Sequence, residues 1–387
     1  MRYDTSCLKS IVVALAIALL CQSPTLAQTF DTKVPYALLM DYDSGTVLFE
    51  KGADEPVPPA SMAKLMTAEY VFSLLKDGKL SLEDEFGVSE YAWRQGGAPS
   101  GGSAMYLELD SRVALNDLLR GLLIQSGNDA AIVIAEGVAG SEPAFADLLN
   151  KRAKEIGMRD SLFRNSNGLP DPEQVVTMRD LATLARYVIQ TYPEHYAIFS
   201  EPEFTWNEIR QSNRNPLLDD GLGVDGLKTG HTKEAGYGIT ASALRNTQRL
   251  ILAISGLESE RDRETEAKKL LDWGFRSFQQ VTAFEADEVV AEASVYGGEV
   301  GRVPLKAKGP IRVLIARTAG EAMKARVVYQ GPIMAPVEAG VQVGAFKVLD
   351  GDRVVQETPL FTAAAVAQGP LHARALDALG ELLLGWL

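Results

Sequence analysis

The chain has 387 residues, a formal net charge of -13, 46% hydrophobic residues and 23% charged residues. That length suits two domains, and the hydrophobic content predicts well-filled cores instead of disorder. The acidic balance excludes broad nucleic-acid binding, because contact with phosphates needs clustered Lys and Arg, so only a local basic pocket could bind an anion.

The first 27 residues are typical of a secretory signal peptide. Basic residues precede an apolar run over 11–20 that is shorter than an ordinary membrane span, and 25–27 (Thr-Leu-Ala) offers a small-residue cleavage site. The alternative is a signal anchor that stays attached. A lipoprotein at Cys21 is disfavoured because a large residue, leucine, precedes it. We therefore expect an exported protein at the periplasmic, extracytoplasmic face of the cytoplasmic membrane.

Cysteine and histidine usage argues against a metal centre. Cys7 and Cys21 both lie in the expected signal peptide, so the mature chain would hold no disulfide, thiol nucleophile or zinc–thiolate site. Only three histidines are present, which disfavours a multi-histidine metal site. We expect neither a metal nor another cofactor.

Residues 28–280 read as an α/β catalytic domain. The pattern predicts a β-hairpin over 36–51, helices over 61–75, 115–124, 130–139, 143–156 and 178–190, strands over 226–231, 237–244 and 249–255, and a helix over 263–275. Helices between an early hairpin and a late set of strands favour an antiparallel sheet with helices packed on its faces.

The residues after 280 have a different sequence pattern. Short alternating runs separated by Gly, Pro and Asp turns predict a small all-β sandwich domain over 281–367. Residues 368–387 predict an amphipathic helix, which we expect to contact the membrane surface; its apolar face carries Leu371, Ala375, Leu379, Leu382, Leu383 and Trp386. The alternative is a helix packed on the protein or on a second subunit.

The pair Ser61 and Lys64 suggests nucleophilic catalysis. A spacing of three puts both side chains on one face of a helix, and Ser61 would stand at the helix start, where negative charge is favoured. A desolvated lysine amine there can lose its proton and act as a base. The pattern alone is weak, since Ser73 and Lys76 have the same spacing but lie in mid-helix.

The second motif, Ser126-Gly127-Asn128, lies between two predicted helices. Taken alone, it favours a capping loop in which Asn128 is the N-cap of the following helix. Polar side chains on loops between rigid helices also suit catalysis.

The third motif, Lys228-Thr229-Gly230, lies on a predicted strand. A lysine at a strand end is usually solvated, whereas a buried one needs a partner or a function. Gly230 would let a substrate backbone approach closely, as if it added a strand to the sheet.

Order, spacing and local structure agree across the three motifs, which together are the signature of penicillin-binding proteins and class A β-lactamases. The sequence resembles the low-molecular-mass penicillin-binding proteins that are D-alanyl-D-alanine carboxypeptidases, serine peptidases that trim peptidoglycan. The resemblance covers about 31–280. Within that range it includes stretches beyond the three motifs, at 101–105, 118–125, 165–169, 213–215, 231–232, 235–237, 263–264 and 268–275.

The resemblance implies a set of catalytic roles. Ser61 attacks the peptide carbonyl between the two terminal D-alanines of a peptidoglycan pentapeptide, and neutral Lys64 takes its proton. Ser126 relays a proton to the leaving group, with Lys228 nearby. β-Lactam antibiotics would be covalent inhibitors.

It also implies substrate-binding roles. Asn128 orients the lysine base and bonds the substrate amide, and backbone N–H groups of the nucleophile and His231 hold the oxyanion. Thr229, followed by Gly230 and with Arg263 behind it, receives the terminal carboxylate, which needs a local fork donor on an acidic protein. Arg214 would lie near the cleft.

Two alternatives remain. A class A β-lactamase needs a deacylating glutamate in a Glu-x-x-Leu-Asn string, but Leu115-Asn116 follows Arg112 and Leu149-Asn150 follows Ala146 at that distance. A non-catalytic wall-binding protein with a vestigial site is disfavoured because all three motifs are intact.

Overall fold

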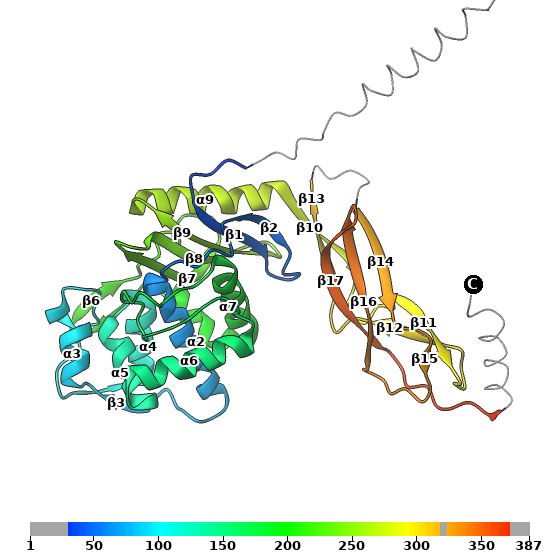
Figure 1. Ribbon diagram of the computed structural model, residues 1–387, viewed down its shortest axis with the longest axis horizontal. Coiled ribbons are helices and arrows are strands. Elements are labelled where there is room, and N and C mark those ends of the chain that lie inside the picture. Colours follow the sequence, from blue (N-terminus) through cyan, green and yellow to red (C-terminus); the bar gives the residue numbers. More distant parts are fainter. Residues whose placement is uncertain (1–29, 318–322, 372–387) are drawn as a thin grey trace, which may run out of the picture. The chain divides into compact units, whose positions relative to one another are not determined.

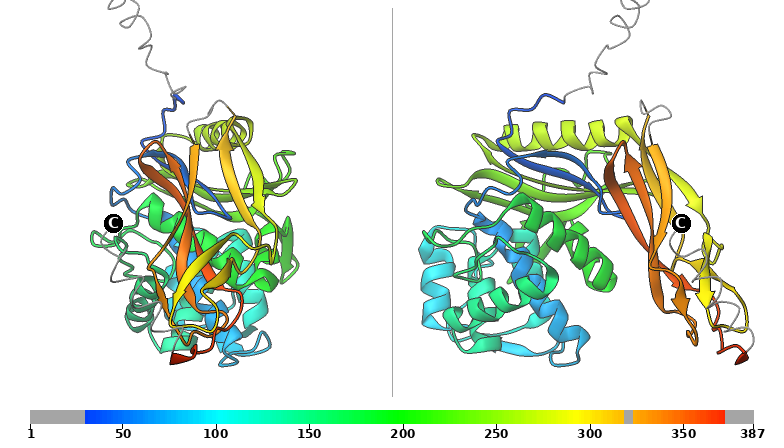
Figure 2. Two further views of the ribbon diagram at one scale, coloured as in Figure 1. Left: turned by 90° about the vertical axis from the view of Figure 1, so that its right-hand side faces the viewer. Right: turned by 45° about the vertical axis from the view of Figure 1, so that its right-hand side comes forward.

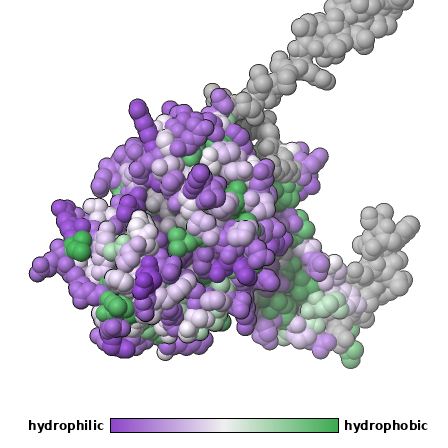
Figure 3. Space-filling model, turned by 60° about the vertical axis from the view of Figure 1, so that its left-hand side comes forward, coloured by the Kyte–Doolittle hydropathy of each residue, from purple (hydrophilic) through white to green (hydrophobic). Residues whose placement is uncertain are grey.

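A computed structural model describes residues 30–317 and 323–371 (Figure 1). The expected signal peptide, 1–27, lies outside the described residues, as does the expected tail helix beyond residue 371. Within the described ranges, no helix combines the length and the apolar character needed to cross a bilayer. Figure 3 shows mainly hydrophilic residues on the face that it presents, with apolar residues in small groups.

A five-stranded antiparallel sheet organises the first part of the chain. Its order is β2-β1-β9-β8-β7, so the first hairpin joins the end of a later meander. The strands are β1 (Tyr36–Asp41), β2 (Val47–Lys51), β7 (Val224–Thr232), β8 (Gly236–Arg245) and β9 (Gln248–Leu257). This order places β7, which carries the Lys-Thr-Gly motif, at an edge of the sheet.

Helices cover both faces of this sheet (Figures 1 and 2). On one face, α9 (Glu260–Ser277) packs against β1, β8 and β9, and on the other α7 (Met178–Thr191) contacts the same strands while α2 (Lys64–Lys76) contacts β7. Because both faces are covered, β8 and β9 each contain six consecutive buried residues. The expected antiparallel sheet with helices on its faces is confirmed.

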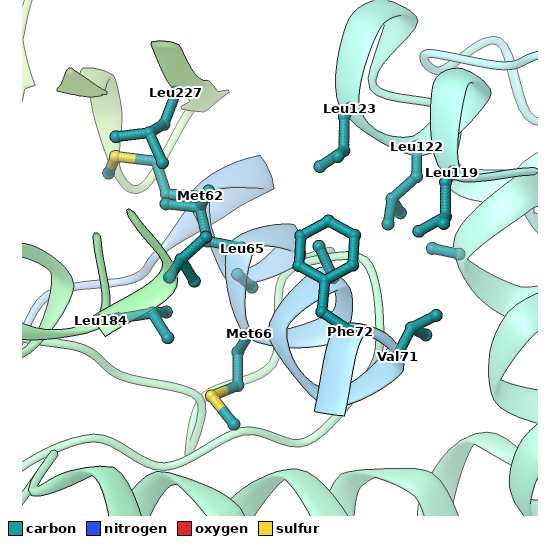
Figure 4. Packing of buried hydrophobic residues seen from close by; sticks show 14 of the residues in the cluster. Met62, Leu65, Met66, Val71, Phe72, Leu119, Leu122, Leu123, Leu184 and Leu227 are labelled. Carbon is teal, nitrogen blue, oxygen red and sulfur yellow. The ribbon is translucent and has the colours of Figure 1, made fainter. Parts of the chain in front are cut away.

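Helix α2 is enclosed by the core, which fixes the turn before it. Figure 4 shows side chains of this segment, Leu65 and Phe72 among them, surrounded by leucines of β7, α7 and the region before Ser126. Burying a Leu or Phe side chain stabilises the fold by about 1.5–3 kcal/mol. The nucleophile candidate is therefore held on a rigid element.

The other elements of this part are short strands and helices. They are β3 (Glu85–Gly87), α3 (Glu90–Gly96), η2 (Ala98–Ser100), β4 (Arg112–Ala114), α4 (Leu115–Arg120), η3 (Gly121–Gln125), α5 (Asn128–Ala139), α6 (Glu142–Ile156), α8 (Pro193–Tyr196), η4 (Ala197–Ser200), β5 (Glu203–Trp206) and β6 (Ile209–Ser212).

The described residues from 278 onward are β-rich, as expected. A six-stranded sheet has the order β14-β16-β17-β12-β11-β15, and β10 pairs with β13. Their bounds are β10 (Phe278–Phe284), β11 (Ala291–Tyr296), β12 (Arg302–Lys306), β13 (Ile311–Ala316), β14 (Met323–Tyr329), β15 (Ile333–Met334), β16 (Gln342–Asp350) and β17 (Arg353–Thr362). Val303, Leu305, Phe346 and Leu360 belong to a separate buried core.

Two predicted helices differ from the structure in a way that matters for the site. The helix expected over 61–75 is a 3-10 turn, η1 (Ala60–Ala63), followed by α2, so the predicted α-helical start at Ser61 is wrong. The helix expected over 115–124 is α4 followed by the π-helical η3. Both departures lie beside motif serines, where the backbone must turn sharply.

Candidate active site

Ser61 lies on the η1 turn, against which two glycines, Gly168 and Gly230, pack closely. Ala60 has a φ of 47°, a left-handed conformation that costs a non-glycine residue energy and persists only where the surroundings impose it. A Cβ at Gly168, whose φ is +83°, would lie 1.8 Å from the Ala60 carbonyl oxygen, and one at Gly230 would lie 3.1 Å from the Pro59 oxygen. The close approach seen at Gly230 is therefore between β7 and this turn.

Lys64 is fully buried and has three hydrogen-bond partners. Its Nζ lies 2.9 Å from Ser61 Oγ, 2.7 Å from Asn128 Oδ1 and 2.7 Å from the carbonyl oxygen of Asn167. Two of these partners are pure acceptors, so a neutral amine would donate both N–H groups to them. Its lone pair would then face the hydroxyl of the serine, which is the arrangement that a general base requires.

The surroundings of Lys64 favour the neutral amine. Burial lowers its pKa from the ordinary lysine value to about 7, while the negative charges of Asp129 and Glu142 oppose that shift. A base is most effective when its pKa lies near the working pH. The chemistry expected from the Ser61–Lys64 spacing is therefore physically available.

Asn128 is a ligand of the lysine and not a helix cap. Helix α5 begins at Asn128 itself, its N-cap position is Gly127, and that position makes no side-chain capping bond. The capping interpretation is therefore wrong. The amide oxygen of Asn128 accepts from Lys64, and its Nδ2 faces Gly102, where a Cβ would lie 3.1 Å away. Because Gly102 also lines the cavity described below, the amide can donate into that space.

Ser126 owes its position to the π-helical segment η3. It follows that segment in a left-handed conformation, with φ 70° and ψ 32°. A Cβ at Gly121 would lie 2.2 Å from Met105 Sδ, so the first residue of η3 must be small. The hydroxyl oxygen of Ser126 is buried and has no hydrogen-bond partner among the described residues. Single π-helical turns are frequent at functional sites, where they re-aim a side chain.

Lys228 is buried on the edge strand β7, so the solvated interpretation is wrong. Its Nζ donates to the Thr229 carbonyl oxygen at 3.0 Å. Its pKa is well below the ordinary value, first because of burial and then because Lys64, Arg214 and Arg263 are positive. Two lysines and two arginines therefore form a local basic site on an acidic protein, and such a site suits an anionic ligand.

Arg263 points from α9 toward the same region, and one of its hydrogen-bond donors has no acceptor in the described part of the chain. Its side chain is only 5% exposed, one terminal nitrogen donates to Glu260 at 2.6 Å, and its Nε has no partner among the described residues. Its guanidinium lies 5.8 Å from the ring of Tyr237, which stacks on His231 at 3.9 Å between ring centroids. A buried guanidinium with a free donor is suited to a carboxylate.

A cavity of about 400 Å³ opens beside these groups. Of the predicted residues, Ser61, Asn128, Arg214 and His231 line it. The other predicted residues do not; they are Lys64, Ser126, Lys228, Thr229, Gly230 and Arg263. Arg214 is fixed there by its Nε, which donates to Gln125 Oε1 at 3.1 Å. The remaining lining residues are Gly101, Gly102, Ser103, Asn167, Gly168, Leu169 and Thr232.

Asn167 is the main contributor that sequence reasoning missed as a site residue. It acts through its backbone oxygen, so its residue type does not indicate this role. The Asn165–Leu169 run stood out in the sequence only as part of the family resemblance. In the described part of the chain, no group of three or more His, Cys, Asp or Glu side chains is arranged to hold a metal ion.

Comparison with known proteins identifies the family. A family model described as D-alanyl-D-alanine carboxypeptidase matches residues 23–259, and one for the C-terminal domain of penicillin-binding protein 5 matches 278–368. The chain is 40% identical over 343 residues to D-alanyl-D-alanine carboxypeptidase DacC of Escherichia coli, covering 88% of this chain and 86% of the relative. It is 36% identical over 353 residues to DacA of the same organism, covering 90% and 87%.

Comparison with solved structures points to the same family. Penicillin-binding protein 5 from Haemophilus influenzae superposes with a TM-score of 0.79 at 35% identity, covering 88% of this chain and 99% of that one. Penicillin-binding protein D2 from Listeria monocytogenes, solved in an ampicillin-bound form, has a TM-score of 0.54 at 30% identity, covering 62% and 97%. The chain therefore belongs to the family of serine D-alanyl-D-alanine carboxypeptidases, the penicillin-binding proteins with a β-rich C-terminal domain.

Proposed function

We propose that this protein removes the terminal D-alanine from peptidoglycan stem peptides through an acyl ester on Ser61, and that β-lactams acylate the same residue. The observation that carries the proposal is the buried Lys64 amine. It lies 2.9 Å from the serine hydroxyl while two carbonyl oxygens take its remaining hydrogen-bonding positions. A nucleophile beside a base that a third group orients is the arrangement expected for covalent catalysis.

The reaction follows from these contacts. Ser61 Oγ bonds to the carbonyl carbon of the penultimate D-alanine as its proton passes to Lys64, and the backbone N–H groups of Ser61 and His231 hold the oxyanion. The C–N bond then breaks, and Ser126 delivers a proton to the leaving D-alanine amine. Water hydrolyses the ester and restores the serine.

Substrate binding uses the basic part of the site. Asn128 orients the base and donates its amide to the substrate backbone, which lies along β7 beside Gly230. Thr229 and Arg263 receive the terminal carboxylate, and the Lys228 amine, which donates to the Thr229 carbonyl oxygen, lies beside them. The unpartnered Nε of Arg263 supports this assignment, because a buried donor without an acceptor is costly until a ligand supplies one.

The sequence further supports an exported protein. We assign 1–27 to a signal peptide, 28–280 to the catalytic domain, 281–367 to the β domain and 368–387 to a helix that holds the protein at the extracytoplasmic face of the membrane. The apolar face of the tail and the export signal support that location.

D-alanine release tests the function directly. A peptide ending in D-Ala-D-Ala should yield free D-alanine with the parent protein and none with Ser61→Ala. Penicillin should be hydrolysed slowly, because the chain has no Glu-x-x-Leu-Asn string to activate a deacylating water. Fast penicillin hydrolysis without D-alanine release would favour a β-lactamase instead, and neither activity would favour a wall-binding protein.

A further inference from the structure

Glu142 is a buried carboxylate that the mechanism above does not use. It is the first residue of α6 and is only 9% exposed. Its Oε1 accepts hydrogen bonds from both the backbone N–H of Ser166, at 3.1 Å, and the Ser166 hydroxyl, at 2.5 Å. A helix N-terminus favours a negative charge, so an acidic side chain suits this position.

Ser166 and Asn167 connect this carboxylate to the lysine base. The Ser166 carbonyl oxygen accepts from the hydroxyl of Thr67 on α2 at 2.6 Å, and the next carbonyl, of Asn167, accepts from Lys64 at 2.7 Å. Both residues of the segment are buried. The segment is thus fixed between α6 and α2, with Glu142 binding it from the α6 side.

We propose that Glu142 is a positioning residue for acyl transfer: its carboxylate holds the Ser166–Asn167 segment that presents a carbonyl oxygen to Lys64, and it places a negative charge near that amine. The inference rests on the proposed role of Lys64 as the base. It goes further by assigning a function to a residue outside the three motifs.

Other charged groups also face Lys64. Asp129 on α5 is negative and Lys228 on β7 is a second amine. The oxygens of Asp129 accept from the backbone N–H groups of Met105, Leu107 and Ala130, so changing Asp129 would also release that loop. Glu142 is therefore the cleaner site at which to remove a charge.

The surroundings of Glu142 tolerate an amide. Its second oxygen lies 3.4 Å from the hydroxyl of Tyr91 on α3, and Glu136 is the other acid near that tyrosine. In Glu142→Gln, the amide oxygen can still accept from Ser166, and the new NH₂ group can donate to the Tyr91 oxygen. This variant removes the charge and keeps the hydrogen bonds, whereas Glu142→Ala removes both.

The test is the pH profile of acylation by a fluorescent penicillin, measured with the full chain. Glu155→Gln is the matched control, since Glu155 lies on the same helix, is 49% exposed and pairs with Arg152. In the parent, acylation should fall below pH 7 as Lys64 becomes protonated. Losing a nearby negative charge destabilises the ammonium, so in Glu142→Gln the acid limb should move down by about one pH unit.

The expected change is measurable at pH 6. There the rate, relative to each variant's own plateau, should rise from about one-tenth in the parent to about one-half in Glu142→Gln, roughly fivefold. Glu155→Gln should follow the parent. Glu142→Ala should also lose at least about tenfold in plateau rate, because the segment that carries the Lys64 acceptor is then held only from the α2 side.

Two results would overturn the inference. If the acid limb of the Glu142→Gln profile superposes on that of the parent, the charge of Glu142 does not affect Lys64. If the plateau rate of Glu142→Ala is unchanged, Glu142 does not position the segment, even if the melting temperature of the variant falls. Should Glu142→Ala not fold, the Glu142→Gln profile decides. Failure of the base assignment looks different: Lys64→Ala would then acylate as fast as the parent.

Discussion

Replacing Gly168 by alanine separates backbone strain from the close contact that positions the lysine. Gly168 follows Asn167, whose carbonyl oxygen binds Lys64. Its φ of +83° lies in the left-handed region, and an added Cβ would be 1.8 Å from the Ala60 carbonyl oxygen. Ordinary van der Waals contact begins at 3.4 Å, so the substitution must push the Asn167 segment away from the Ser61 turn.

The two effects have different magnitudes and readouts. An L-residue in the left-handed conformation costs about 1–2 kcal/mol, which appears as lost stability. The displacement exceeds an ångström, and a misplacement of about 1 Å at a catalytic group can cost about 10²-fold in rate. Gly140 is a matched control, because its φ is +78° and a Cβ added there would have no atom within 4 Å.

The assay pairs denaturant unfolding with the second-order rate of acylation by a fluorescent penicillin. Both Gly168→Ala and Gly140→Ala should lose about 1–2 kcal/mol or more of stability, but only Gly168→Ala should acylate about 10²-fold more slowly. If Gly168→Ala acylates within about twofold of Gly140→Ala, the Asn167 carbonyl does not position the base and the reasoning is refuted.

Three further outcomes follow from the site and the sequence. Acylation should drop at pH 6 to about one-tenth of its plateau, since Lys64, with a pKa of about 7, is then mostly protonated; a flat profile between pH 6 and 8 would contradict this. Arg263→Ala should lose about 1.5–3 kcal/mol of transition-state binding for peptides with a free C-terminus, read as kcat/KM for D-alanine release, and lose less with small penicillins; equal activity on the peptide would take Arg263 out of the site. Deleting 369–387 should leave D-alanine release intact and move the protein from membrane to soluble fractions; continued sedimentation with membranes would point to an uncleaved N-terminal segment, which sequencing the mature N-terminus would reveal.

Much of the fold was predictable because burial leaves a periodic trace in the sequence. The hairpin, the β7–β9 meander and the long helices α6 and α7 have strong alternating or helical patterns, and each was predicted to within a few residues. The η1 turn and the π-helical η3 were not predictable. Both depend on tertiary contacts, such as Gly168 against Ala60, that no local pattern reports.

The candidate site was predictable to the extent that side-chain identity carries its chemistry. Serine and lysine at a spacing of three indicate a nucleophile and a base, and the contact between Ser61 and Lys64 follows. The role of Asn128 was ambiguous in the sequence, because asparagine is also a common helix cap. The role of the Asn167 carbonyl could not be predicted, since every residue has a carbonyl group. The role of Glu142 could not be predicted either, because it acts through a segment distant in sequence.

The most direct test of the whole account is the identity of the residue that penicillin modifies. After brief incubation with a fluorescent penicillin, proteolysis and mass spectrometry should find a single acylated residue, Ser61, and Lys64→Ala should form that adduct far more slowly. Ser73 provides an internal comparison, because it shares the Ser-x-x-Lys spacing but donates its hydroxyl to the Tyr70 carbonyl in mid-helix. An adduct on Ser73 or on any residue other than Ser61 would contradict the account.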